Sequence, residues 1–198
     1  MSGVVPDRTA GVECECFVLM TNHVHLLMTP AAPRNASELM RHLNLRFVHL
    51  MNRKYGRTGS GWEGRFWSSI VETGAYFIRC QRYIELNPVR AGLVKNPAKY
   101  PWSSHACNAF GTPSSIVEPH AEYLALGGND VRRRAAYRAL FLEGLDDAEL
   151  GAIRQAARSS LPYGSEAFIR ELESTLQRPM TRGRPGPRGR VSRLPPAA

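Results

Sequence analysis

Apolar residues gather in short runs near the start of the chain, in a pattern that predicts strands. Residues 13–20 and 23–28 are two such runs, and the polar pair Thr21-Asn22 lies between them. Runs of this length on either side of a tight turn are typical of two paired strands. Residues 65–72 follow a glycine-rich loop and have the same character, so we expect a third strand there.

Farther along the chain, apolar residues recur every three or four positions, which indicates helices. In residues 36–54 the apolar positions with this spacing are Leu39, Leu43, Phe47 and Leu50. A second helix is expected over residues 74–87. It should end before Pro88, because the residue that precedes a proline is disfavoured in the helical conformation.

These patterns divide the chain into three segments. Residues 13–106 carry the expected strands and the first two helices. Residues 107–177 form a helical extension, with helices expected over 130–142 and 146–158. Residues 178–198 are rich in proline, glycine and arginine, a composition that predicts a disordered basic tail in the absence of a partner.

Charge points to a polyanionic partner. The 198 residues include 26 basic and 17 acidic side chains, a net charge of +9. Six arginines and no acidic residue lie in residues 178–198, and residues 34–65 hold seven basic side chains against two acidic ones. Such a distribution favours nucleic acid as the partner. A basic surface that is merely solvated is the alternative, and charge alone does not decide between them.

The sequence predicts no membrane partner and a cytoplasmic location. It has no run of about 18 apolar residues that could span a bilayer, and its start lacks the features of a signal peptide. The four cysteines form no Cys-x-x-Cys pair, which fits a reducing compartment better than a disulfide framework.

Two histidines flank a single apolar residue in the second predicted strand. Alternate residues of a strand point to the same face, so His23 and His25 should project together while Val24 enters the core. Two neighbouring imidazoles on a rigid sheet supply two ligands of a divalent-metal site.

The helix over residues 74–87 offers groups that could complete such a site. Tyr83 and Asn87 are four residues apart and therefore lie on one helix face. The Asn87 amide oxygen is a hard ligand that suits Mg²⁺ or Mn²⁺, and the Tyr83 phenol is a potential nucleophile. Tyr76 is the alternative phenol on roughly the same face. A tyrosine on an amphipathic helix is also commonly a core or interface residue.

A structural zinc site is the competing interpretation of the metal-ligating residues. Its ligands would be Cys14, Cys16, His23 and His25. Strand parity and the hard amide ligand argue against this alternative.

Two strings of the sequence resemble a known family. They are Thr21-Asn-His-Val-His-Leu-Leu27 and Tyr83-Ile-Glu-Leu-Asn-Pro-Val-Arg-Ala-Gly-Leu-Val94. Together and in this order they resemble the single-tyrosine HUH transposases, and among these the REP-associated tyrosine transposases with their IS200-like domain. The resemblance covers about residues 14–106.

The resemblance implies an activity and a set of functional residues. It implies His23, His25 and Asn87 as ligands of Mg²⁺ or Mn²⁺, and Tyr83 as the nucleophile. The implied reaction cleaves and rejoins single-stranded or hairpin DNA through a 5′-phosphotyrosine intermediate. The implied assembly is a monomer or a homodimer, in which Tyr83 serves its own metal site or that of a partner subunit.

The implied fold is α+β, an antiparallel sheet with helices on one face in the ferredoxin-like (RRM-like) HUH arrangement. Members of the family carry a strand and a helix before the one that bears Cys14, so we expect this chain to lack the first strand and helix. A catalytically inactive, DNA-binding relic of such a transposase is therefore an alternative function, and the structural zinc protein is a second.

Basic residues outside this constellation are candidates for DNA binding. On the helix over residues 36–54, and just after it, these residues are Arg41, Arg46, Arg53, Lys54 and Arg65. In the tail, Arg182-Gly-Arg184-Pro resembles the core of an AT-hook, in which Arg-Gly-Arg lies in a narrow minor groove. A tail that binds phosphates without specificity is the alternative.

Overall fold

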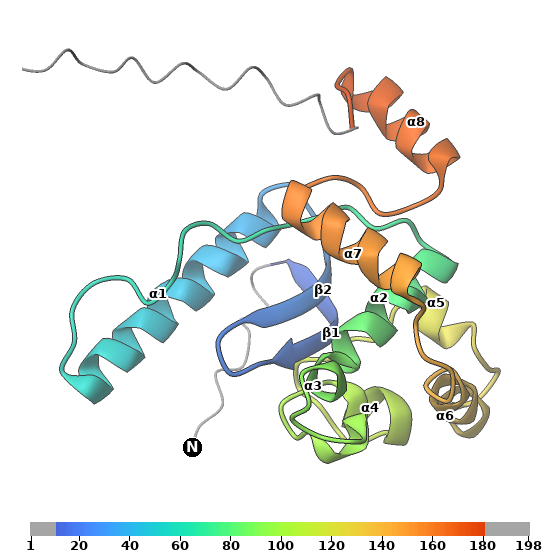
Figure 1. Cartoon of the computed structure of the whole chain (residues 1–198), viewed down its shortest axis with the longest axis horizontal. Coiled ribbons are helices and arrows are strands. Elements are labelled where there is room, and N and C mark those ends of the chain that lie inside the picture. The colour runs from blue at the N-terminus through green and yellow to red at the C-terminus, as the bar shows by residue number, and fades with distance from the viewer. Residues whose placement is uncertain (1–10, 181–198) are drawn as a thin grey trace, which may run out of the picture.

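The computed structural model describes residues 11–180 and has α+β architecture (Figure 1). The elements are β1 (Val12–Leu19), β2 (Val24–Pro30), α1 (Asn35–Tyr55), α2 (Ala75–Glu85), α3 (Asn87–Arg90), the 3₁₀ helix η2 (Pro97–Lys99), α4 (His105–Phe110), α5 (Ala121–Leu124), α6 (Asp130–Ala139), α7 (Asp147–Ser159) and α8 (Glu166–Leu176). The α+β class and the antiparallel sheet are confirmed. The ferredoxin-like arrangement, with a lost first strand and helix, stays a prediction.

The two predicted strands form an antiparallel hairpin. Val18 pairs with His25 and Leu19 with Val24, and the amide of Met20 donates to the carbonyl of His23 over 2.8 Å to close the turn. Glu15 lies at an irregularity in the register between Cys14 and Cys16. A bulge of this kind adds a residue to one strand and bends it locally.

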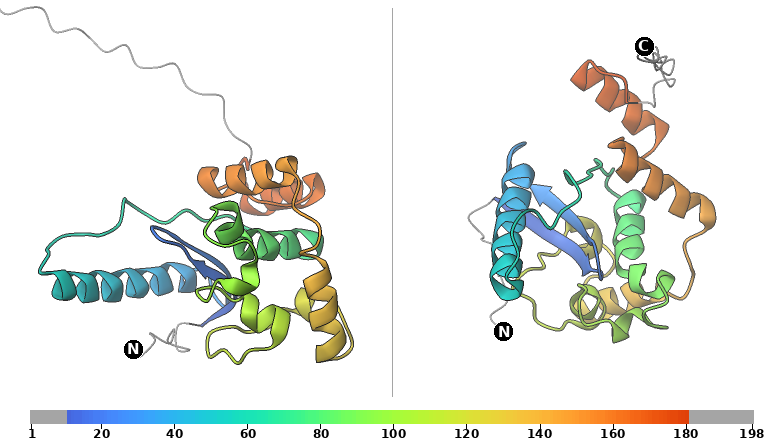
Figure 2. Two further views of the ribbon diagram at one scale, coloured as in Figure 1. Left: turned by 60° about the horizontal axis from the view of Figure 1, so that its bottom comes forward. Right: turned by 60° about the vertical axis from the view of Figure 1, so that its left-hand side comes forward.

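Helix α2 covers one side of this hairpin. Cys16 and Val18 of β1 are fully buried and lie in one apolar cluster with residues of α2 and α7. The members of that cluster from these two helices are Phe77, Cys80, Tyr83, Ile84, Ile153 and Ala156. In the views of Figures 1 and 2, α1 lies on the opposite side of the hairpin from α2. The core therefore holds α2 firmly against the strand that precedes the two histidines.

Helix α1 is long, and only its first half is packed. Leu39 and Met40 are buried, whereas Phe47 and Leu50 are 42% and 51% exposed. The apolar spacing correctly predicted a helix, but the apolar residues of its second half, Phe47 and Leu50, lie outside the core. Figure 1 shows that half of α1 extending away from the hairpin.

The prediction of a strand over residues 65–72 is wrong. Within the described part of the chain this segment forms only an isolated bridge, between Val71 and Tyr163. The amide of Glu72 and the carbonyl of Ile70 bond to the backbone of Tyr163, so the segment connects α1 to α2 and contacts the loop before α8. An apolar, β-branched run becomes a strand only where a neighbouring strand offers a continuous ladder, and residues 11–180 offer none at this place.

The helical extension has a small core of its own. Ala109, Tyr123 and Tyr137 are buried together, and Leu126, Leu140 and Phe141 pack around them. The helices expected over 130–142 and 146–158 are confirmed as α6 and α7. None of the helices in residues 11–180 is both long and apolar enough to cross a bilayer. The predicted disordered tail lies mostly outside the described residues.

Candidate active site at the end of the hairpin

The hairpin turn brings the two histidines together. His23 lies in the turn and His25 in β2, and their ring centroids are 5.0 Å apart in an edge-to-face arrangement. The Nδ1 atom of His23 is 2.7 Å from the Oδ1 atom of Asn22. An amide oxygen can only accept, so Nδ1 carries the hydrogen and Nε2 of His23 has the free lone pair.

Helix α2 places Tyr83 beside this pair. The Tyr83 ring lies edge-to-face with that of His25, with centroids 5.7 Å apart. Tyr83 is only 8% exposed and belongs to the core cluster under β1. The predicted juxtaposition of this phenol with the imidazoles is therefore present, and Tyr83 has a fixed position relative to them.

Asn87 lies one turn farther on, at the junction between α2 and α3. Helix α2 ends at Glu85 and α3 begins at Asn87, with Pro88 in its first turn, where a proline needs no hydrogen-bond acceptor. The Nδ2 atom of Asn87 donates to the carbonyl of Tyr83 over 3.2 Å. Since the nitrogen makes this bond, the amide oxygen is the atom that would ligate a cation.

The surroundings of His25 lower its pKa and favour its neutral form. Burial, together with the charges of His23 and Arg90, lowers its pKa from 6.5 to about 4. A neutral imidazole is the form that binds metals. Protonation of His25, which would remove its metal-binding form, is therefore displaced from the ordinary range near pH 6.5 to a more acidic range.

These features fit a small divalent cation. The amide oxygen is the hard ligand that Mg²⁺ or Mn²⁺ prefers, whereas imidazoles bind divalent first-row metals more generally. The bond from His23 to Asn22 is the kind of outer contact that orients metal-binding histidines. The roles of His23, His25 and Asn87 as ligands and of Tyr83 as nucleophile stay predictions.

The alternative residues are not brought to this place. The Tyr76 ring packs instead against Tyr163, with centroids 5.1 Å apart. Within residues 11–180 no group of three or more His, Cys, Asp and Glu side chains could hold a metal ion, so the four-ligand zinc site is not assembled. Burial also raises the pKa of Cys14 to about 12, which opposes the thiolate that zinc requires.

The predicted DNA-binding residues lie on an exposed surface. Arg41, Arg46, Arg53 and Lys54 are exposed on α1, and Arg65 is exposed in the loop that follows. Trp62 of this loop packs against α1, with its ring centroid 5.1 Å from that of Phe47, and Trp67, two residues after Arg65, is 68% exposed. Arg182 and Arg184, with the AT-hook-like string, lie outside the described residues.

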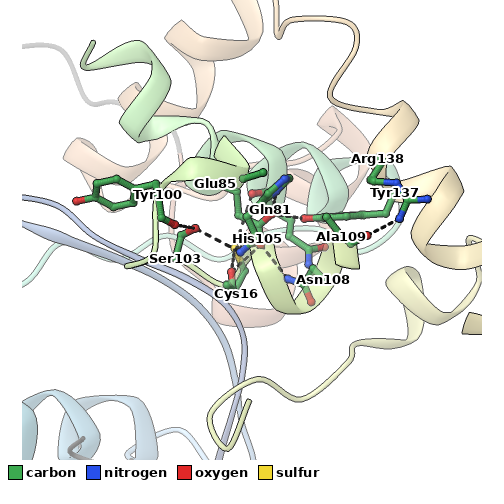
Figure 3. Close-up of polar contacts among 12 residues, drawn as sticks. Cys16, Gln81, Glu85, Tyr100, Ser103, His105, Asn108, Ala109, Tyr137 and Arg138 are labelled. Atoms are coloured by element: carbon green, nitrogen blue, oxygen red, sulfur yellow. Dashed lines mark hydrogen bonds and ion pairs between the residues drawn. The ribbon is translucent and has the colours of Figure 1, made fainter. Parts of the chain in front are cut away.

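A buried network around Glu85 was not predicted from the sequence. The Glu85 carboxylate is fully buried and accepts hydrogen bonds from Ser104 (2.6 Å), His105 (2.9 Å), Asn108 (2.9 Å) and Tyr137 (2.9 Å). Figure 3 shows His105 and Asn108 of α4 and Tyr137 of α6 beside Glu85, which ends α2. Because Glu85 lies between Tyr83 and Asn87, the network fixes the end of the helix that carries them.

Two comparisons with known proteins find similar sequences. The family model described as "Transposase IS200 like" matches residues 7–87. The chain is also similar to a REP-associated tyrosine transposase of Escherichia coli (strain K12), with 27% identity over 98 residues that cover 49% of this chain and 56% of that relative. Both matches support the IS200/REP tyrosine transposase family and confirm the resemblance predicted from the sequence. No solved structure matches the chain.

The chain spans only about half the length of the relative it matches. The family match ends at Asn87 and includes the hairpin, α1 and α2. All four predicted site residues, His23, His25, Tyr83 and Asn87, therefore lie within the matched region.

Proposed function

We propose that this protein is a metal-dependent DNA transposase that cleaves and rejoins single-stranded DNA through Tyr83. The observation that carries the proposal is the contact between the rings of Tyr83 and His25, whose centroids are 5.7 Å apart. A nucleophile held beside a pair of imidazoles can attack a phosphate that the same site binds. The family match supports the same activity.

In the proposed reaction the phenolic oxygen of Tyr83 attacks the scissile phosphorus. A bond forms between phosphorus and that oxygen, and the bond to the 3′-oxygen of the preceding nucleotide breaks. The phenol proton passes to solvent, and the leaving oxygen takes up a proton to become a free 3′-hydroxyl. The products are a 5′-phosphotyrosine link and a 3′-end, and the step is reversed when a 3′-hydroxyl attacks the link.

His23, His25 and Asn87 would hold a Mg²⁺ or Mn²⁺ ion. Such an ion supplies charge neutralisation at the phosphate oxygens. The protein's own contribution is orientation, because the hydrogen bonds from Asn87 to Tyr83 and from His23 to Asn22 restrict the side chains before DNA binds.

The exposed basic residues of α1 would bind the DNA backbone. Arg46 and Arg53 are exposed on the helix that flanks the hairpin. Trp67, exposed in the segment after α1, offers an aromatic surface on which unpaired bases could stack. We therefore propose single-stranded or hairpin DNA as the partner. For the assembly we propose a monomer or a homodimer, and for the location the cytoplasm.

Incubation with single-stranded hairpin DNA and Mn²⁺ tests this function. We expect a covalent protein–DNA adduct that Tyr83→Phe abolishes and that a chelator prevents. The matched control is Tyr76→Phe, which removes a hydroxyl from the same helix but leaves the site intact. DNA binding without any adduct would contradict the proposed activity and support the DNA-binding relic.

A further inference from the structure

Arg90 makes two contacts with Tyr83. Its Cζ atom lies over the Tyr83 ring, 4.2 Å from the centroid, and its Nη2 atom donates to the Tyr83 carbonyl over 2.8 Å. Arg90 ends α3, so the turn formed by Asn87 and Pro88 folds this side chain back onto the preceding helix. The guanidinium is thereby held against the residue proposed as the nucleophile.

The positive charge of Arg90 has no anionic partner among the described residues. No ion pair within residues 11–180 includes it, and its Nε and Nη1 atoms are buried without a hydrogen-bond partner. N–H groups that are buried without an acceptor are costly, most of all on a charged side chain. A ligand that supplies the missing acceptor is one explanation for such groups in a native structure.

A second cation lies on a helix that packs against the same core, because Ile153, the residue before Arg154, is buried in one apolar cluster with Tyr83. Arg154 is exposed on α7, and its charge, after the larger effect of burial, lowers the pKa of Arg90. The same guanidinium of Arg90 also contributes to the low pKa of His25. Two arginines on separate elements thus repel each other at one place, an arrangement that a bound anion would relieve.

We propose that Arg90 and Arg154 form a phosphate-binding site beside Tyr83, with Arg90 as a catalytic residue. This inference rests on the proposed function. A DNA phosphate positioned for attack by the Tyr83 hydroxyl would lie within reach of the Arg90 guanidinium, whose planar array of N–H groups suits phosphate oxygens.

The proposed role is the stabilisation of charge on the phosphoryl oxygens as Tyr83 attacks. Arginine keeps its positive charge throughout the reaction, so it transfers no proton and needs no further reactant. Arg154, at the surface, would bind the neighbouring phosphate and guide the strand toward Arg90.

The first test measures DNA binding in the presence of a chelator, where cleavage does not occur. The probe is a fluorescent single-stranded oligonucleotide of mixed sequence, titrated over a range of salt concentrations. Removing one interaction with a phosphate should lower the slope of log K against log[salt] by about 0.7. We expect this decrease for Arg90→Gln and for Arg154→Gln.

Two variants serve as matched controls. Arg138→Gln removes a guanidinium that also donates to a backbone carbonyl, that of Ala109, and lies over a ring, that of Phe110. Arg158→Gln removes an exposed charge one turn beyond Arg154 on α7. Both should keep the wild-type slope. An unchanged slope in the Arg90 and Arg154 variants would overturn the proposal.

The second test follows adduct formation in a single turnover with Mn²⁺. Removal of a preorganised charge donor costs roughly 10²–10³-fold in rate, so Arg90→Gln should react that much more slowly at saturating DNA. Arg90→Lys should recover part of the rate, and an equal decrease in both variants would indicate a purely structural role and overturn the catalytic one.

The two tests separate this inference from the proposed function. If the wild-type protein forms no adduct but Arg90→Gln and Arg154→Gln lower the slope, the phosphate site stands and the transposase activity fails. If circular dichroism shows that Arg90→Gln does not fold, the Arg154→Gln variant provides the test. Arg154 is exposed, so its substitution leaves the core unchanged. A wild-type slope for Arg154→Gln would then overturn the site.

Discussion

The hydroxyl of Tyr137 donates a hydrogen bond to the buried carboxylate of Glu85 over 2.9 Å. Tyr137 lies on α6, in the helical extension, and Glu85 ends the helix that carries Tyr83. Both side chains are fully buried. The bond therefore connects the extension to the candidate active site, and the extension stabilises the position of the proposed nucleophile.

We expect Tyr137→Phe to destabilise the protein by about 1–3 kcal/mol, because it removes a hydrogen bond to a buried charged group. Chemical denaturation monitored by circular dichroism measures the change. Tyr100→Phe is the control, since its hydroxyl bonds to the Leu19 carbonyl at an exposed position. Equal destabilisation of the two variants would show that the hydrogen bond to Glu85 contributes no more to stability than the exposed one.

The sequence predicted the parts of the site that depend on local rules. Strand alternation predicted that the imidazoles would lie together, and they do, although His23 lies in the turn before β2. Helical spacing placed Tyr83 and Asn87 one turn apart. That these two elements would meet was implied by the family resemblance and is present in the structure as the contact between His25 and Tyr83.

The network around Glu85 could not be predicted in this way. Its partners lie 19, 20, 23 and 52 residues away in the chain, and no periodicity links them. The strand expected over 65–72 failed for a related reason, because its residues have strand character but no partner strand within residues 11–180. Arg90 is part of the string from Tyr83 to Val94 that resembles the family, but only the fold brings its guanidinium onto the Tyr83 ring.

Removal of the outer partner of His23 should weaken metal binding. Asn22→Ala deletes the oxygen that fixes the His23 ring, and deleting such a partner typically lowers metal affinity by about 10–100-fold. Isothermal titration with Mn²⁺ measures the affinity. His25→Ala should reduce it further, whereas His49→Ala, an exposed residue of α1, should not change it. Unaltered Mn²⁺ affinity in the Asn22 and His25 variants would exclude the proposed ligands.

The buried carboxyl of Glu15 should make stability depend on pH. Burial raises its pKa from 4.5 to about 7, and the side chain is only 2% exposed. Between these two values the folded state holds a proton that the unfolded state releases, so the free energy of unfolding falls as pH rises from about 4.5 through 7. A carboxylate whose pKa is lowered in the folded state has the opposite effect, because it makes the free energy of unfolding rise with pH.

Glu15→Gln tests this dependence. The variant should be more stable than the wild type at pH 8, by on the order of 2 kcal/mol, and nearly equal to it at pH 4.5, where Glu15 is neutral in the folded state. Thermal unfolding at a series of pH values measures the difference. Glu171→Gln, at an exposed position on α8, is the control. A constant difference across the pH range would show that Glu15 does not titrate near pH 7 in the folded protein.

The exposed arginines of α1 should contribute to DNA affinity through salt-dependent interactions. Replacing Arg46 and Arg53 together with alanine should lower the slope of log K against log[salt] for single-stranded DNA by about 1.4, because each arginine that binds a phosphate contributes about 0.7. Stability should change little, since both side chains are exposed. The matched control replaces Arg132 and Arg170, exposed on α6 and α8. If both double variants reduce the slope equally, binding follows net charge alone and α1 is not a specific DNA-binding surface.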